Sequence, residues 1–263
     1  MRFAVIGCEV LFRECCLAAA ASPATIDLVM LPQGLHNNPP DLRTRVQQEI
    51  DRLDGETSTS QPAYDALLIG YALCSNGAVG LTARRAPLVI PRGHDCITLL
   101  LGGKETYQHY FDTHAGIYWY SSGWIERTTQ PGRERYEQAY QRYVAQYGED
   151  NAEYLMEMEQ GWYKGYAWAT YINWDLPTAE RDRQFTRECA DYLGWNFDEI
   201  EGDRRLLFDL FAGQWDNDRF LVVPPGSCIE PIYDGTIMKA CAGCACHGAE
   251  LCSQTAGPAP LNR

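Results

Sequence analysis

The stretch Ala66-Leu-Leu-Ile-Gly-Tyr71-Ala-Leu-Cys74 decides the fold that this sequence predicts. Its first six residues, Ala66–Tyr71, are almost entirely apolar, which is typical of a strand that is covered on both faces. Further runs of this kind occur at Phe3–Gly7, Ile26–Leu31, Leu88–Ile90 and Gly116–Tyr120. Helical patterns separate these runs, so we expect strands that lie parallel and are joined by helices.

One of these helices follows the second strand and begins near Pro39 and Pro40. Its apolar residues recur at spacings of four, four and three residues, as Leu42, Val46, Ile50 and Leu53. Such a stripe is typical of an amphipathic helix that packs on a sheet. The alternation of strands and helices predicts an α/β fold with a doubly wound, mainly parallel sheet.

The sequence also predicts a division along the chain. Residues 1–123 are expected to form the α/β half that carries the site. Residues 124–215 have helical patterns crowded with aromatic residues, and one helix face carries Tyr136, Tyr140, Tyr143 and Tyr147. These rings predict either an aromatic core between helices or the wall of a substrate pocket. Residues 216–235 supply a returning strand, and residues 236–263 form a Cys-rich tail.

Composition excludes several classes of protein. The formal net charge of −13 disfavours binding to nucleic acid or to an anionic membrane surface, because both need basic residues. No run approaches the roughly 18 apolar residues of a membrane helix, and the N-terminal residues predict a first strand rather than a signal peptide. We therefore expect a cytoplasmic protein. In that reducing compartment its 11 cysteines favour metal binding or catalysis over disulfides.

Three cysteines each follow a different predicted strand. Cys8 follows the first strand, Cys74 the third and Cys96 the fourth. Ligands of open α/β sheets bind beyond the carboxyl ends of the strands, and neighbouring strands lie only about 4.8 Å apart. Three thiols at this edge predict a shared metal site, because a cation can neutralise converging thiolates. The alternatives are buried structural cysteines and a thiol or disulfide redox centre.

The identity of the metal depends on a fourth ligand. His36 follows the second strand, so it is a candidate ligand, a candidate acid or base, or a loop residue bonded to nearby backbone. Three Cys and one His form a normal tetrahedral zinc set. Three Cys alone suit a 4Fe–4S cluster in which one iron stays open to substrate.

Other polar residues accompany these cysteines. Ser75, Asn76 and Gly77 follow Cys74 where a helix is expected to begin, and backbone N–H groups there favour an anion. Arg92 is expected to hold a carboxylate of the substrate. His94 and Asp95, beside Cys96, are candidates for proton transfer.

Further cysteines occur near the C-terminus. The segment Leu221-Val-Val-Pro-Pro-Gly-Ser-Cys228 resembles Leu88-Val-Ile-Pro-Arg-Gly-His-Asp-Cys96, so Cys228 is an additional candidate ligand. The tail then carries a cluster that consists of Cys241, Cys244, Cys246 and Cys252. This cluster predicts a second metal site, a flexible tail with incidental thiols, or a segment that folds back over the main site.

Several motifs resemble a known prokaryotic family, the domain of unknown function 1638. They are Gly70-Tyr-Ala-Leu-Cys74-Ser-Asn-Gly77, Pro91-Arg-Gly-His-Asp-Cys96-Ile-Thr-Leu-Leu-Leu-Gly102, Gly116-Ile-Tyr-Trp-Tyr-Ser-Ser-Gly-Trp124 and Leu35-His-Asn-Asn-Pro39. The resemblance covers about residues 1–235 and brings no established activity. Members of the family often lie near corrinoid methyltransferase genes, which implies anaerobic one-carbon metabolism and a corrinoid protein or methyltransferase as a partner.

The leading hypothesis is an enzyme with a three-cysteine 4Fe–4S centre. Its open iron would act as a Lewis acid on a small anionic or heteroatom-bearing substrate, as in a lyase or a desulfidase. One alternative is a zinc–thiolate protein that accepts or delivers a methyl group in corrinoid metabolism. Another is a non-enzymatic metallochaperone, or an accessory subunit of a corrinoid methyltransferase system.

Overall fold

The computed structural model describes residues 1–55 and 62–242. The chain divides into two compact units. The first unit comprises residues 1–104 together with the chain from Asp203 onward, and the second unit comprises Glu105–Gly202.

The first unit is built on a mostly parallel sheet. Within the described residues this sheet has the strand order β2-β1-β3-β4-β8, in which only β8 runs antiparallel to its neighbour. Its strands are β1 (Arg2–Cys8), β2 (Thr25–Leu31), β3 (Ala66–Gly70), β4 (Leu88–Pro91) and β8 (Phe220–Val223). From the central β1 the chain adds β2 on one side and β3 and β4 on the other. The strand order therefore reverses between β1 and β3.

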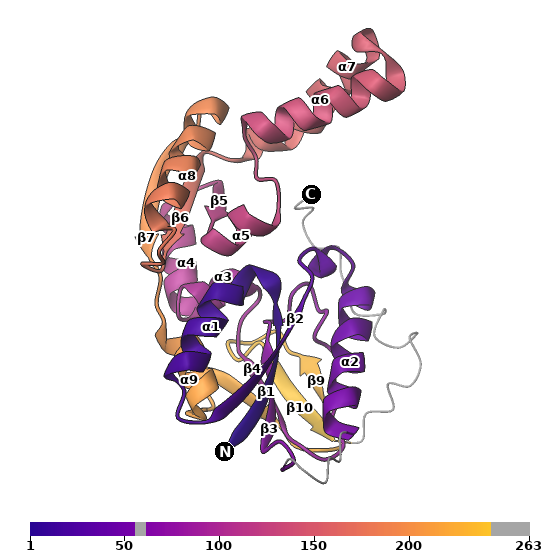
Figure 1. Ribbon diagram of the computed structural model, residues 1–263, viewed down its shortest axis with the longest axis vertical. Coiled ribbons are helices and arrows are strands. Elements are labelled where there is room, and N and C mark those ends of the chain that lie inside the picture. The colour runs from indigo at the N-terminus through magenta and orange to yellow at the C-terminus, as the bar shows by residue number, and fades with distance from the viewer. Residues whose placement is uncertain (56–61, 243–263) are drawn as a thin grey trace. The chain divides into compact units, whose positions relative to one another are not determined.

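Helices cover both faces of this sheet (Figure 1). One face carries α1 (Phe12–Ala21) and α9 (Arg205–Ala212), and the other carries α2 (Pro39–Gly55). The predicted apolar stripe of α2 is confirmed, because Leu42, Val46, Ile50 and Leu53 are all buried. Short helical segments occupy the loops, namely η1 (Glu9–Leu11), η2 (Leu35–Asn37) and α3 (Cys96–Leu100).

A small antiparallel sheet completes the described part of the first unit. It consists of β9 (Ser227–Pro231) and β10 (Met238–Ala242). Of the predicted tail cluster only Cys241 is described, and it lies in β10. Cys244, Cys246 and Cys252 lie outside the described residues.

The second unit has its own parallel sheet, with the order β5-β6-β7. The strands are β5 (Ile117–Tyr120), β6 (Trp168–Asn173) and β7 (Asn196–Glu201). The helices are α4 (Lys104–Thr113), α5 (Ser122–Arg127), α6 (Arg133–Tyr147), α7 (Glu149–Glu159), η3 (Gln160–Gly165) and α8 (Ala179–Leu193). Tyr120 and Tyr171 are fully buried with Cys189 in the core of this unit.

The predicted division at residue 123 is therefore wrong. The strand β5 pairs with β6 instead of joining the first sheet, and the supposedly helical residues 124–215 contain two strands. The run Trp168–Asn173 contains aromatic and apolar residues. It follows many aromatic residues in helical patterns, so its strand character was not predicted. The strand Asn196–Glu201 is half-buried and carries three acidic residues, which strands usually avoid.

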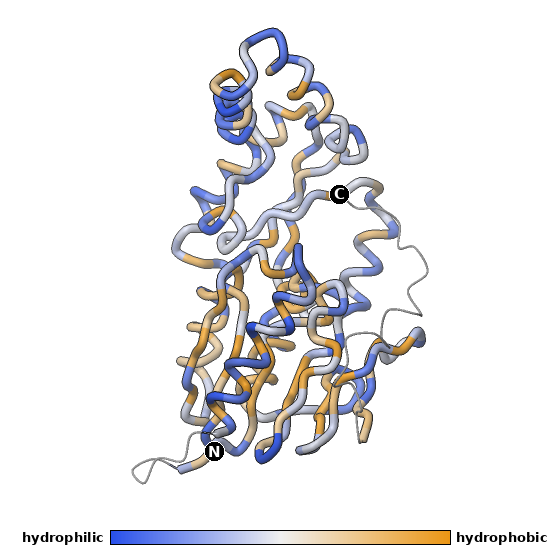
Figure 2. Tube along the Cα trace, turned by 90° about the vertical axis from the view of Figure 1, so that its right-hand side faces the viewer, coloured by the Kyte–Doolittle hydropathy of each residue, from blue (hydrophilic) through white to orange (hydrophobic). Residues whose placement is uncertain are grey.

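The burial pattern agrees with the hydropathy of the chain. In Figure 2 the strands of the first unit are mostly hydrophobic in colour, and β3 and β4 are buried along their whole length. Among the described residues, no helix has the length and apolar character needed to cross a membrane. The general α/β fold predicted from the sequence is confirmed.

Candidate metal centre

Two glycines determine how β1 and β3 end. Gly7 and Gly70 are register partners in these parallel strands, so the next residues, Cys8 and Tyr71, lie side by side at the carboxyl ends. A Cβ atom on Gly70 would lie only 3.1 Å from Cα of Gly7. Glycine is therefore needed for the close approach of the two backbones. Both Cys8 and Tyr71 are buried.

The loops after β3 and β4 continue side by side. The N–H of Leu73 donates to the carbonyl of Gly93 at 3.0 Å, and the N–H of Cys74 donates to the carbonyl of His94 at 2.9 Å. Cys96 follows His94 by two residues, as the first residue of α3. Backbone hydrogen bonds thus bring the segments that carry Cys74 and Cys96 together.

The backbone at Cys74 is unusual. Cys74, Ser75 and Asn76 have φ angles of 46°, 55° and 67°, in the left-handed region that residues other than glycine rarely adopt. The left-handed conformation costs roughly 1–2 kcal/mol per residue, less for Asn. The N–H of Gly77 closes the turn on the carbonyl of Cys74 at 3.0 Å. Strain of this kind concentrates at functional sites.

This turn corrects one prediction. The helix expected to begin at Ser75, Asn76 and Gly77 is absent from the described structure, which has turns from Cys74 to Gly80 instead. Successive left-handed residues cannot start a right-handed helix. The side chains of Ser75 and Asn76 are exposed beside the buried Cys74.

The three strand-end cysteines share one neighbour, the hydroxyl of Tyr71. Burial is the largest cause that raises the pKa of Tyr71, and the charges of Cys8, Cys74 and Cys96 each raise it further. The hydroxyl faces the Cys8 thiol. It makes no hydrogen bond to a nitrogen or oxygen atom of the described residues. The three predicted ligands are therefore all near enough to one buried side chain to act on it electrostatically.

Burial keeps the thiols of Cys8 and Cys74 neutral. It raises the pKa of Cys8, against a lowering by a backbone hydrogen bond from Val10. It raises the pKa of Cys74 to about 12, with smaller increases from Asp95 and Cys8. Cys8, Cys74 and Cys96 are thiols and not disulfide sulfurs. Within residues 1–55 and 62–242, however, no three His, Cys, Asp or Glu side chains are placed to coordinate one ion as they stand.

His36 interacts electrostatically with Asp95, the residue that precedes Cys96. It is half-buried in η2, and burial lowers its pKa more than Asp95 raises it. A neutral imidazole is the form that binds a metal or accepts a proton.

Asp95 has a structural role at the start of α3. Its Oδ1 atom accepts hydrogen bonds from the N–H groups of Ile97 at 3.0 Å and Thr98 at 3.3 Å, so it is the N-cap of this helix. His94 is exposed. The predicted role of these two residues in proton transfer stays a prediction.

The guanidinium of Arg92 donates its hydrogen bonds to backbone carbonyls and not to a ligand. Its Nε atom donates to the carbonyls of Asn217 at 2.8 Å and Phe220 at 3.1 Å. Its Nη1 atom donates to the carbonyls of Thr236 and Met238. The guanidinium thus ties β4 to β8 and β10, which does not support the predicted binding of a substrate carboxylate.

Cys228 is placed in the small sheet. It lies in β9, opposite Cys241 of β10, and its backbone forms a bridge with Thr82. The internal similarity between the Cys96 and Cys228 segments does not extend to the fold, because β8 runs antiparallel to β4.

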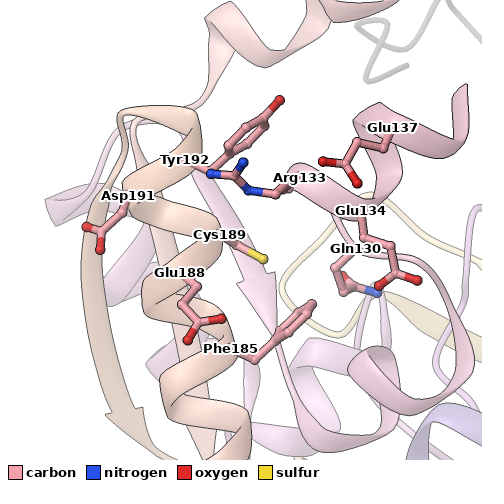
Figure 3. Close-up of a pocket in the computed structure, with 10 residues that line it drawn as sticks. Gln130, Arg133, Glu134, Glu137, Phe185, Glu188, Cys189, Asp191 and Tyr192 are labelled. Carbon is pink, nitrogen blue, oxygen red and sulfur yellow. The ribbon is translucent and has the colours of Figure 1, made fainter. Parts of the chain in front are cut away.

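The second unit contains a separate cleft of about 650 Å³ between α6 and α8. Figure 3 shows Arg133 and Glu137 on one wall, with the Cys189 sulfur and the Phe185 ring directed inward from the other. Burial raises the pKa of Cys189 to about 11. This thiol is therefore neutral and belongs to the core of the second unit.

The place of Tyr71 beside Cys8 was not predicted from the sequence. The signal was its position directly after Gly70, but only the register of β1 against β3 places it beside Cys8. A strand pattern alone does not reveal this register.

Comparison with known proteins identifies the family. The model of a family described as a protein of unknown function, DUF1638, matches residues 30–211. The chain belongs to this family, as its motifs predicted. The matched segment includes His36, Cys74 and Cys96 and begins after Cys8. Searches of curated proteins and of solved structures found no match.

Proposed function

We propose that this protein is an enzyme in which Cys8, Cys74 and Cys96 hold a 4Fe–4S cluster at the switch point of a doubly wound sheet. The observation that carries the proposal is that the strand register sets Cys8 beside Tyr71, backbone hydrogen bonds join the segments of Cys74 and Cys96, and all three thiols act electrostatically on Tyr71. Cys8 ends β1, and Cys74 and Cys96 lie beyond β3 and β4, on the carboxyl side of the sheet and near the reversal of strand order. Ligands of α/β sheets bind at such points.

The two candidate centres require different distances between their thiolates. With Zn–S bonds of about 2.3 Å, tetrahedral thiolates stand about 3.8 Å apart. Cysteines that bind different irons of one cluster stand further apart. Within residues 1–55 and 62–242 no three donor side chains are placed to hold one ion as they stand, so the choice of a cluster rests on the three-cysteine donor set.

A cluster with three cysteine ligands would supply one open iron as a Lewis acid. The protein's own residues would do the rest. His36 is neutral near pH 7, because burial lowers its pKa, so it is able to accept a proton. Ser75 and Asn76 present an exposed hydroxyl and amide next to Cys74, where they would hydrogen-bond a small substrate. These features suit an elimination, a hydration or the removal of a leaving group from an anionic or heteroatom-bearing molecule.

The test is elemental analysis of protein purified without oxygen. We expect about four irons and four acid-labile sulfides per chain, with a broad absorbance near about 400 nm. Protein that contains neither iron nor sulfide after anaerobic reconstitution would rule out the cluster.

A zinc–thiolate protein is the second candidate, and His36 favours it. A half-buried neutral imidazole would complete a Cys3His zinc set. Such a centre would activate a bound thiol to accept a methyl group from a methylated corrinoid protein, whose Co–C bond would break as the S–C bond forms. This candidate predicts about one zinc per chain and no iron, and a loss of zinc affinity in His36→Ala.

A further inference from the structure

Tyr71 is a polar side chain in a place where an apolar one would suffice. It is 4% exposed, and its hydroxyl makes no hydrogen bond to a nitrogen or oxygen atom of the described residues. Buried hydroxyls are normally hydrogen-bonded, because burial removes the bonds they make with water. Phenylalanine would fill the same space without this penalty. The hydroxyl therefore needs an explanation beyond packing.

The surroundings of the Tyr71 hydroxyl indicate which atom accepts its hydrogen bond. The register of β1 and β3 places Tyr71 beside Cys8, and the hydroxyl faces the Cys8 thiol. A neutral thiol is a weak acceptor, whereas a thiolate is a strong one. Metal binding removes the proton from the thiol and creates the better acceptor.

We propose that Tyr71 is a positioning residue that donates its O–H to the metal-bound sulfur of Cys8 and thereby raises the reduction potential of the centre. This inference rests on the proposed cluster. A hydrogen bond to a ligand sulfur draws electron density from the cluster and stabilises its reduced, more negative state. No covalent step and no proton transfer are involved.

The test compares wild type with Tyr71→Phe, which lacks only the hydroxyl. Both proteins are reconstituted with iron and sulfide without oxygen, and midpoint potentials are measured by redox titration followed by electron paramagnetic resonance. We expect unchanged iron and sulfide content and a lower midpoint potential in Tyr71→Phe. The metal-free variant should melt at or above the wild-type temperature, because the hydroxyl has no strong acceptor there.

The matched control is Tyr120→Phe. Tyr120 is also fully buried, and its hydroxyl lies against the Cys189 thiol of the second unit while donating to the carbonyl of Pro131 at 3.0 Å. This variant should melt at a lower temperature, because it loses a hydrogen bond that is present without metal. Its midpoint potential should equal that of wild type.

Three results would overturn the inference. One is an equal midpoint potential in wild type and Tyr71→Phe, which leaves the cluster itself intact as a proposal. Another is a metal-free Tyr71→Phe that melts well below wild type or fails to fold, which would make the hydroxyl a structural group. The third is wild-type protein without iron, which removes the proposed function together with the inference.

Discussion

Gly77 supports the cysteine turn, and replacing it with alanine tests the packing described for the site. A methyl group at this position would lie 2.4 Å from Cδ2 and 3.0 Å from Cγ of Leu42 in α2. Leu42 is 1% exposed, so it cannot rotate away into solvent. Either the turn that carries Cys74 or the helix α2 must move.

The expected loss of stability follows from two opposing effects. Overpacking of a buried contact costs typically about 1–3 kcal/mol. Replacing glycine with alanine restricts the unfolded chain and returns about 0.4–1 kcal/mol. We therefore expect Gly77→Ala to lower the free energy of unfolding of the first unit by about 1–2 kcal/mol.

Urea denaturation followed by circular dichroism measures this loss, and a double-mutant cycle with Leu42→Ala locates its cause. Leu42→Ala alone should cost about 2–5 kcal/mol through the cavity it leaves. In the double variant the new methyl group enters that cavity, so the total loss should be smaller than the sum by at least about 1 kcal/mol. Losses that add to within about 0.5 kcal/mol, or a neutral Gly77→Ala, would refute the contact between the turn and α2.

Three further predictions concern backbone strain, acid stability and metal affinity. Ser75→Gly should stabilise the protein by about 0.5–1 kcal/mol in thermal denaturation, because glycine tolerates the left-handed backbone. The control Ser75→Ala should not stabilise it. Equal changes in stability for the two variants would contradict the backbone strain at Ser75. Arg183 lowers the pKa of Glu199 through a 2.7 Å ion pair. A lowered carboxyl pKa stabilises the fold above the unfolded pKa, so Arg183→Gln should cost up to about 1 kcal/mol at about pH 7 in urea denaturation. This difference should shrink as the pH falls below about 4 and through the lowered pKa of Glu199. Because burial raises the pKa of Cys8 and Cys74, zinc binding to the metal-free protein must displace protons, and competition with a chelator should show an affinity that rises with pH. An affinity independent of pH would speak against thiolate ligands.

The fold of the first unit was predictable because its strands are simple. The strands β1, β3 and β4 are buried on both faces, so their sequences are continuous apolar runs, which predict buried strands. The strands β6 and β7 escaped detection. β6 contains aromatic residues and β7 is acidic, and both lie in a unit whose helices dominate the pattern.

The candidate site was predictable in part. The position of a cysteine after each strand follows from the chain order, and the parallel sheet brings these positions to one edge. The identity of the shared neighbour does not follow, since Tyr71 meets Cys8 only through the register of Gly7 with Gly70. The hydrogen bonds of Arg92 were equally hidden, because its acceptors lie more than 120 residues further along the chain.

The central claim is that the strand-end cysteines hold the metal. Its most direct test is the metal content of Cys74→Ala after anaerobic reconstitution, measured beside Cys189→Ala. Cys189 is a matched control, because it is a buried thiol in the core of the second unit. We predict that Cys74→Ala loses its iron and its absorbance near about 400 nm, while Cys189→Ala retains both. Retention of iron by Cys74→Ala would contradict the account and place the metal elsewhere in the chain.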